Sequence, residues 1–261
     1  MRLSFVIPTR NQGVYIAQCI DSCIAQGIED SEIVVVDGAS TDDTRDVLAS
    51  YGDRVRWISE PDRGQSDALN KGVRMARGEL VAWINSDDYY VDTRAIPRLL
   101  AEFDRDPRVD IAYGDGLRVD VRGAPIGPYK GRPIASVAQI VIHPASFVLQ
   151  PSLVFRRQLF LDVGGVDESL HFTMDYELWI RLFAAARATR YVPAVIACAR
   201  YHEDAKSIAA MGKQIREAHA VKKRAARKLG FGPLERARMH AGVASMGVYW
   251  MAVRLGLKRA A

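Results

Sequence analysis

Long apolar runs, cysteine and low-complexity sequence are all scarce in this chain. No uncharged apolar run is long enough to cross a bilayer. The first apolar run, residues 3–7, is too short for a secretory signal and ends at Pro8. The three cysteines, Cys19, Cys23 and Cys198, lack the spacing of metal ligands, and an odd count disfavours a disulfide framework. We therefore expect a reduced protein located in the cytoplasm.

Charge is divided unevenly along the chain. The 261 residues include 36 Lys and Arg and 31 Asp and Glu, a net charge of +5. Residues 211–261 hold 12 of the basic residues and 2 of the acidic ones, which leaves 24 basic and 29 acidic residues before them. A mildly acidic body with a basic tail indicates an anionic surface as a neighbour of the tail.

Apolar periodicity predicts alternating strands and helices over residues 1–90. Strands are expected at residues 3–9, 32–37, 55–59 and 80–84, with helices over residues 15–24 and 66–75. Ser40 and Asp43 have the spacing of a capping box for a further helix. This alternation predicts a doubly wound α/β sheet with right-handed crossovers.

The pattern loosens after residue 95. It predicts a helix at residues 96–103, a strand at 110–113, an antiparallel piece at 117–121 and a loop over 123–133. A helix at residues 176–186 and strands near Tyr191 and Ile196 complete the core. We predict a domain over residues 1–207, with halves 1–95 and 96–207, and a helical tail over residues 208–261.

The stretch from residue 80 to residue 90 is the centre of this organisation. A buried strand, residues 80–84, is followed directly by Asn85, Ser86, Asp87 and Asp88. Two adjacent carboxylates after a buried strand need something to balance their charge, and at the carboxyl end of a central strand this is usually a ligand or a metal. The alternative is that both aspartates cap a helix or form a turn.

Five segments in order carry a family resemblance. They are VIPTRN at residues 6–11, VVVDGASTD at 34–42, NSDD at 85–88, GGVDE at 164–168 and DYELW at 175–179. This ordered set, over residues 1–207, resembles the family-2 glycosyltransferases of GT-A fold that act in bacterial cell-surface glycan synthesis. The resemblance implies a Rossmann-like nucleotide-binding sheet with a mixed acceptor half.

The resemblance also implies a binding site for a nucleotide diphosphate sugar. It assigns to Asp37 the N3–H of a uracil-like base, and to Arg63 a phosphate. For Asp37 the alternative is a simple turn residue, and for Arg63 a solvated loop side chain. The remaining residues assigned to the donor are Pro8, Thr9, Asn11, Gly38, Ser40, Gln65, Asn85 and Asp87.

The same family pattern implies a divalent cation. Asp87 and Asp88 would bind Mn²⁺ or Mg²⁺, which neutralises the diphosphate leaving group. The family has Asp-x-Asp where this chain has Asn85 in the first position. His202 matches a family histidine that completes the metal shell, and an imidazole favours Mn²⁺. A structural histidine is the alternative.

Asp175 matches the position of the family's general base. The family usually has Glu-Asp here, and Met174 replaces the Glu. A base that takes the proton of an acceptor hydroxyl during in-line attack implies inversion of the anomeric carbon. The alternative is an acid favoured by the N-terminus of a helix. Asp167 and Glu168 would lie on the acceptor side.

These implications predict a metal-dependent, inverting, non-processive glycosyltransferase. It would move one sugar, from a UDP-sugar by preference, to a hydroxyl acceptor on a glycan or a lipid-linked glycan. The chain has no Gln-x-x-Arg-Trp pattern of processive synthases. A catalytically silent nucleotide-binding scaffold is one alternative. A sugar-1-phosphate nucleotidyltransferase is another, but it would need a Gly-rich basic loop where this chain has PTRN at residues 8–11.

The basic tail leaves two interpretations open. Residues 213–228 contain seven basic residues, and residues 246–255 combine Tyr249 and Trp250 with apolar neighbours. This composition fits an interfacial helix attached to the inner membrane face. The alternative, which we favour slightly, is a helical hairpin that packs on the body or on a second subunit. Nucleic acid is not an expected partner, because no platform of aromatic and basic residues is present.

Overall fold

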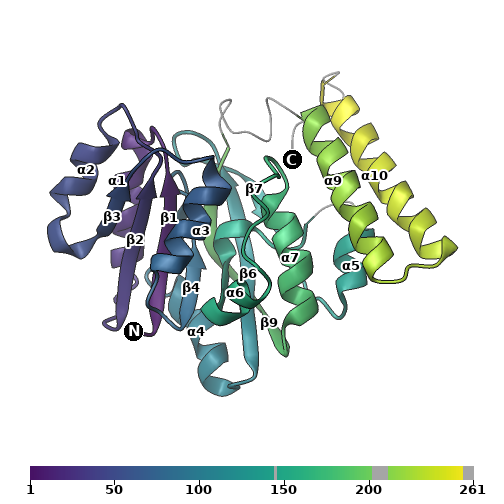
Figure 1. The fold of residues 1–261 in the computed structure, drawn as a ribbon, viewed down its shortest axis with the longest axis horizontal. Coiled ribbons are helices and arrows are strands. Elements are labelled where there is room, and N and C mark those ends of the chain that lie inside the picture. Colours follow the sequence, from purple (N-terminus) through teal and green to yellow (C-terminus); the bar gives the residue numbers. More distant parts are fainter. Residues whose placement is uncertain (144–145, 202–210, 255–261) are drawn as a thin grey trace.

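The computed structural model describes residues 1–143, 146–201 and 211–254 of the chain. Within these ranges one nine-stranded sheet runs in the order β3-β2-β1-β4-β8-β6-β9-β5, and β7 pairs with β6 beside this path (Figure 1). Within these ranges, no helix has the length and apolar character to cross a bilayer.

The first half of the sheet is parallel, as predicted. β1 (Leu3–Thr9) pairs with β2 (Ser31–Asp37) on one side and β4 (Leu80–Trp83) on the other, and β3 (Arg56–Ser59) pairs with β2. The connecting helices are α1 (Gly13–Ile24), α2 (Thr44–Ser50) and α3 (Gln65–Met75), with a short 3₁₀ turn η1 (Gly52–Arg54). The strand order reverses beside β1, and ligands of open α/β sheets bind at such a point, outside the carboxyl ends of the strands.

Burial on both faces explains the uniformly apolar strands of this half. All seven residues of β1 are buried. On one face, Val6 joins Leu69 and Val73 of α3 in a common core. On the other face, Phe5 joins Ile16 and the rest of the apolar stripe of α1 in a second core. Parallel strands covered by helices on both faces need such apolar runs.

The second half turns the sheet into a mixed one. β8 (Leu153–Arg156) is antiparallel to both β4 and β6 (Val109–Val119), and β6 is parallel to β9 (Ala188–Arg200). Two short strands complete it: β5 (Tyr89–Tyr90), which pairs with β9, and β7 (Pro125–Tyr129), which pairs with β6. The helices are α4 (Ala95–Arg105), α5 (Val137–Ile142), α6 (Arg157–Asp162) and α7 (Met174–Ala185), and η2 (Gln150–Ser152) precedes β8.

Three of the expected boundaries in this half are wrong. The strands expected at residues 110–113 and 117–121 form the single strand β6, those near Tyr191 and Ile196 form β9, and the expected loop contains β7. Gly114 and Gly116 lie inside β6. A Cβ at Gly114 would lie 2.6 Å from Cγ1 of Ile196, so glycine here allows the close approach of β9.

The capping box predicted for Ser40 and Asp43 is also wrong. Helix α2 begins at Thr44, and the side chain of Asp43 makes no capping hydrogen bond. Asp42 takes that role, since its carboxylate accepts from the Thr44 N–H at 3.0 Å and from the Gly13 N–H at 3.1 Å. One carboxylate therefore ties the first turns of α1 and α2 together.

The basic tail forms two antiparallel helices, α9 (Met211–Lys228) and α10 (Pro233–Arg254), beside α5 and α7 (Figure 1). Val221 of α9 and Met239 of α10 are buried in the core that also holds Trp179 of α7. Lys222 is buried too, and its ammonium donates to the carbonyl of Val141 at 3.1 Å. Burial lowers the pKa of Lys222 to about 8. The hairpin therefore packs on the body, while the division at residue 207 stays a prediction.

Gly72 allows α3 to lie directly on the sheet. A Cβ at this position would be 2.5 Å from Cγ1 of Val6 and 3.4 Å from Cγ2 of Val36. We expect Gly72→Ala to lower the free energy of unfolding by about 1–3 kcal/mol, because overpacking outweighs the better helix propensity of alanine. Urea denaturation measures the change. Gly212→Ala is the control, since its Cβ would meet nothing nearer than 3.8 Å. A Gly72→Ala protein as stable as the unchanged chain would contradict this packing.

Candidate functional site

Asp37 lies buried at the carboxyl end of β2 and accepts three kinds of hydrogen bond. Its carboxylate receives the Ser40 N–H at 3.1 Å, the Ser40 hydroxyl, and the Ser59 hydroxyl at 2.6 Å. Ser59 ends β3 directly opposite Asp37 in the parallel register. Sequence reasoning missed Ser59, although its place at the end of the neighbouring strand was a usable signal.

The loops that follow β1 and β2 are joined by hydrogen bonds. Asn11 and Ala39 both have left-handed backbones, with φ of +52° and +55°. The Asn11 N–H donates to the Ser40 hydroxyl at 2.7 Å, and the Asn11 side-chain carbonyl accepts from the Thr41 N–H at 2.8 Å. Asparagine tolerates this conformation better than most residues. The predicted donor residues Asn11, Asp37 and Ser40 therefore form one connected network.

Pro8, Thr9 and Gly38 line the same strand ends. Pro8 and Thr9 are the last residues of β1, and the Gly38 N–H donates to the Thr9 carbonyl at 2.9 Å. The Thr9 hydroxyl is buried and has no hydrogen-bond partner among the described residues. A Cβ at Gly38 would lie 2.4 Å from Oδ2 of Asp62, so glycine admits this carboxylate to the strand end. Asp62 was also missed from the sequence.

The segment after β4 places one carboxyl deep in the protein. Asp88 is 5% exposed, and its Oδ1 accepts from the Arg200 N–H at 2.8 Å. Burial raises the pKa of the Asp88 carboxyl, the charge of Asp87 raises it further, and Arg200 counteracts part of the rise. Asp87 is partly exposed beside it. The side-chain Oδ1 of Asn85 accepts hydrogen bonds from Gln65 at 2.7 Å and from the Trp83 indole at 3.1 Å.

Arg200 is the main residue of this region that the sequence analysis left without a role. Its guanidinium is buried, donates to the Asp87 carbonyl at 2.9 Å and to Gln18 at 2.6 Å, and lies 4.6 Å from the Tyr15 ring centre. A buried cation next to two carboxylates offsets part of their mutual repulsion. Its position at the end of a predicted strand, just before Tyr201, is the sequence feature that could have identified Arg200.

The chemistry of the Asp87–Asp88 pair suits a hard divalent cation. Two adjacent carboxyl groups, one buried with a raised pKa, offer the oxygen ligands that Mg²⁺ and Mn²⁺ prefer. Across the described ranges, no three His, Cys, Asp or Glu side chains group closely enough to hold an ion by themselves. The predicted third ligand, His202, lies outside the described residues.

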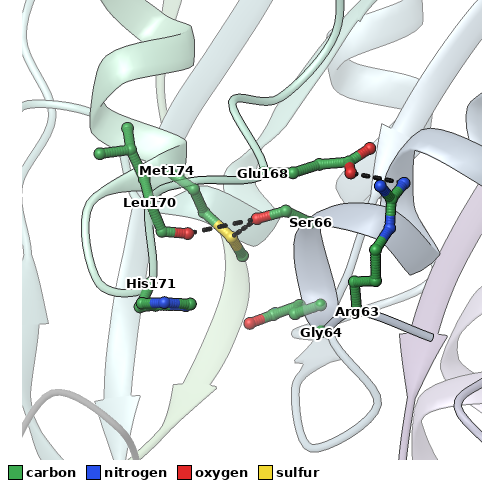
Figure 2. Close-up of a pocket in the computed structure, with 8 residues that line it drawn as sticks. Arg63, Gly64, Ser66, Glu168, Leu170, His171 and Met174 are labelled. Atoms are coloured by element: carbon green, nitrogen blue, oxygen red, sulfur yellow. Dashed lines mark hydrogen bonds and ion pairs between the residues drawn. The ribbon is translucent and has the colours of Figure 1, made fainter.

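Residues 63–66 lie across a small pocket from residues 168–174 (Figure 2). Arg63 forms ion pairs with Glu168 at 2.7 Å and with Asp67 at 3.3 Å. The Ser66 hydroxyl donates to the Met174 sulfur at 2.8 Å. Since Gln65 also donates to Asn85, residues 63–66 link the loop after β4 to the start of α7. Gly64, Leu170 and His171 line the small pocket between the two sides.

Asp175 is the second residue of α7, directly after Met174. Burial raises the pKa of its carboxyl, and the nearby charge of Glu217 adds to the rise. Burial also raises the pKa of the Tyr201 phenol, with contributions from both Asp88 and Asp175. The predicted base Asp175 and Asp88 therefore both raise the pKa of the same phenol. Met174 fills the place of the expected Glu as a packing residue.

The two predicted acceptor-side acids differ in their surroundings. Glu168 pairs with Arg63, and its Oε1 accepts from the Asn70 side chain at 3.0 Å. Asp167 accepts from Ser169 and pairs with Arg224 of α9 at 3.3 Å. Hydrogen bonds from Ser169, opposed in part by burial, lower the pKa of Asp167. Of the two acids, Glu168 is therefore the one tied directly to the segment that carries Gln65 and Arg63.

With a Rossmann-like half sheet and acids gathered at its carboxyl edge, the molecule has the architecture of a nucleotide-sugar enzyme. The chain belongs to glycosyl transferase family 2, whose family model matches residues 4–161. This confirms the resemblance that the five sequence segments carry.

Two curated relatives illustrate the range of the family. A PGL/p-HBAD biosynthesis glycosyltransferase of Mycobacterium bovis is 30% identical over 199 residues, which cover 74% of this chain and 75% of that protein. An uncharacterized glycosyltransferase of Rickettsia felis is 29% identical over 213 residues, 77% of this chain. The chain spans about a third (34%) of the length of the Rickettsia relative.

Solved structures confirm the GT-A fold. Residues 1–349 of S. aureus TarS, in complex with UDP-GlcNAc, match with a TM-score of 0.69 and 19% identity, over 94% of this chain and 71% of that one. The mannosyltransferase PcManGT from Pyrobaculum calidifontis, in complex with GDP-Man and Mn²⁺, matches with a TM-score of 0.67 and 18% identity, over 99% and 81% of the two chains.

The buried carboxyl of Asp175 costs the unliganded protein stability. Because its pKa is raised in the folded state, the folded protein binds a proton there more tightly than the unfolded chain does. We expect Asp175→Asn to raise the Tm at pH 7, and this advantage to vanish as the pH falls below about 4, the unfolded-state pKa of Asp.

Asp106→Asn is the matched control for that prediction. Hydrogen bonds from Arg108 lower the pKa of Asp106 to about 2, so its charge adds stability above the unfolded-state pKa that is lost as the pH falls. This variant should therefore lower the Tm at pH 7. Differential scanning calorimetry from pH 3 to pH 8 measures both. A lower Tm for Asp175→Asn at pH 7 would contradict the assignment of a desolvated carboxyl.

Proposed function

We propose that this chain transfers one sugar from a nucleoside diphosphate sugar to a hydroxyl group of an acceptor. The reaction would be metal-dependent, would invert the anomeric carbon and would be non-processive, and the product would be a cell-surface glycan or glycolipid. The observation that carries the proposal is the link made by residues 63–66, which contact Asn85 on one side and Met174, next to Asp175, on the other. Donor and acceptor chemistry thus share one connected frame.

Asp37 supports a uracil nucleotide as the donor. Its carboxyl group is held by Ser40 and Ser59 at the end of β2, where its oxygens would accept the N3–H of uracil. Asn11 and Gly38 would border the nucleoside, and the Thr9 hydroxyl offers a further polar contact. The complex of TarS with UDP-GlcNAc supports the same choice of base. Arg63 would then exchange Glu168 for phosphate oxygens.

Asp87 and Asp88 would hold the divalent cation, with His202 as a further ligand. When bound, the cation would supply positive charge for the diphosphate as it leaves. The complex of PcManGT with GDP-Man and Mn²⁺ supports this role for a metal in the fold. Arg200 would keep this segment in place, because its backbone N–H donates to Asp88 Oδ1 and its guanidinium donates to the backbone carbonyl of Asp87.

Asp175 would act as the general base. The acceptor hydroxyl oxygen attacks the anomeric carbon from the face opposite the diphosphate, and its proton passes to the Asp175 carboxylate. The bond between the anomeric carbon and the diphosphate oxygen breaks with its electron pair on oxygen, so a nucleoside diphosphate leaves. A raised pKa suits this step, because a carboxylate whose pKa lies closer to neutral pH is a stronger base.

The proposed location is the cytoplasmic side of the inner membrane. The exposed basic residues of α9 and α10 would contact anionic lipid, or a second copy of the chain, near a lipid-linked acceptor. The acceptor would then lie near Asp167, which pairs with Arg224 of the hairpin, and near the adjacent Glu168.

Nucleotide binding is the first prediction of this proposal. We expect UDP at a hundredfold excess over its Kd to stabilise the protein by about 2.7 kcal/mol, and Mn²⁺ to strengthen the effect. Thermal shift with UDP, dTDP, GDP and CMP, each with and without Mn²⁺, measures it. Asp87→Ala should remove the Mn²⁺-dependent part, whereas Asp53→Ala, an exposed aspartate of η1, should not. No shift with any of the nucleotides would count against the donor site.

Turnover is the second prediction. Asp175→Asn should lower kcat by about 10²- to 10⁴-fold, because a general base contributes on this scale, while UDP binding stays intact. Release of UDP from a UDP-sugar with a soluble acceptor measures kcat, and proton NMR of the first product reports the anomeric configuration. Unchanged kcat in the folded variant would rule out the base, and retention of configuration would rule out single displacement.

A further inference from the structure

The first turn of α7 depends on a side chain from the C-terminal hairpin. The Glu217 carboxylate of α9 accepts the N–H of His171 at 3.1 Å and the N–H groups of Phe172 and Thr173 at 2.8 Å each. It also accepts the Thr173 hydroxyl at 2.8 Å. Thr173 is the N-cap residue of α7, and its own side chain makes no capping bond within the helix. Glu217 therefore anchors, from 44 residues away, the segment that leads into α7 and its N-cap residue.

We propose that Glu217 is a positioning residue for the transfer reaction, holding Asp175 in place through the three amide groups before it. This inference rests on the proposed function of Asp175 as the base. Asp175 stands two residues after Thr173, so a segment fixed by four hydrogen bonds leaves its backbone little freedom. A displacement of about 1 Å at a reacting group can cost 10²-fold in rate.

Charge gives Glu217 a second effect on the same carboxyl. Burial alone would raise the pKa of Glu217, but the hydrogen bonds from residues 171–173 outweigh it and lower the pKa. An ionised Glu217 then repels charge on Asp175, whose pKa is raised by burial and by Glu217. The other groups that face Asp175 are the phenols of Tyr129 and Tyr201. The two neighbouring carboxyl groups therefore have pKa values shifted in opposite directions, lowered for Glu217 and raised for Asp175.

The remaining contacts of α9 show that it is seated firmly enough for this role. Arg224 pairs with Asp167 at 3.3 Å and with Glu177 of α7 at 3.6 Å. Lys222 binds the carbonyl of Val141 at the end of α5, and Val221 is buried in the shared core. Figure 1 shows α9 running alongside α7. The hairpin is therefore a structural part of the acceptor half.

The test compares Glu217→Ala and Glu217→Gln with Val221→Ala in the full chain, using UDP-sugar transfer. Val221→Ala is the control, because it loosens the packing of α9 without touching residues 171–173. We expect Glu217→Ala to lower kcat about 10- to 100-fold with donor KM changed less than threefold. Glu217→Gln should recover much of kcat, because its side-chain oxygen still accepts hydrogen bonds. It should also shift the acidic limb of the pH profile of kcat to lower pH. Equal losses in Glu217→Ala and Val221→Ala would overturn the proposal.

Hydrogen exchange separates this proposal from the proposed function. Amide exchange at His171, Phe172 and Thr173 should be at least tenfold faster in Glu217→Ala and unchanged in Val221→Ala. Equal exchange in the two variants would overturn the role of Glu217, whatever the activity assay gives. If the unchanged chain transferred no sugar from any donor, the proposed function would be rejected. Amide hydrogen exchange would then decide by itself whether Glu217 holds the segment before α7.

Discussion

The parallel register of β2, β1 and β4 is the constraint on which the rest of the site depends. Thr9 lies opposite Asp37, and the strands that flank β1 end at the same edge of the sheet. Polar residues that follow these strands are therefore brought to the same edge, and Asn11 and Ser40 bond to one another there. The antiparallel β8 then returns the chain so that β6 and β9 extend the sheet, and the end of β9 brings Arg200 to the aspartate pair.

Burying a carboxyl group costs free energy unless it is hydrogen-bonded or paired, and Asp37, Asp88 and Asp175 differ in the partners they have. Asp37 is saturated by two serines, while Asp88 has one backbone N–H and the nearby guanidinium of Arg200. Asp175 has the Tyr176 N–H and a repelling neighbour in Glu217. A protein selected for stability alone would have little reason to keep Asp88 and Asp175 desolvated, and such conflicts are typical of functional sites.

Local sequence rules predicted the parallel half well and the mixed half less well. Apolar runs marked β1, β2 and β4 because burial on both faces demands them. The same rules predicted two separate pieces where β6 is one strand, within which Gly114 allows the close approach of β9. Ser40 has the pattern of a helix cap, yet it binds Asp37, because a buried carboxylate competes for the same hydroxyl.

The residues missed altogether were those whose partners are distant in the chain. Ser59 lies 22 residues from Asp37, Glu217 lies 44 residues from Thr173, and Arg200 lies 112 residues from Asp88. No periodicity or short motif encodes such pairs, since they exist only once the sheet and α9 are in place. The family pattern predicted which side chains react, and the structure was needed to find the residues that contact them.

The central claim is that a nucleotide and a cation bind together at the carboxyl edge of β1, β2 and β4. Paramagnetic broadening of backbone amide NMR signals by Mn²⁺ in the presence of UDP tests it most directly. The account predicts that signals of residues 86–90 broaden first, while those of residues 27–32 persist, because β2 is about 20 Å long and these residues lie at its opposite end. Equal broadening at both ends, or broadening centred on residues 27–32, would contradict it.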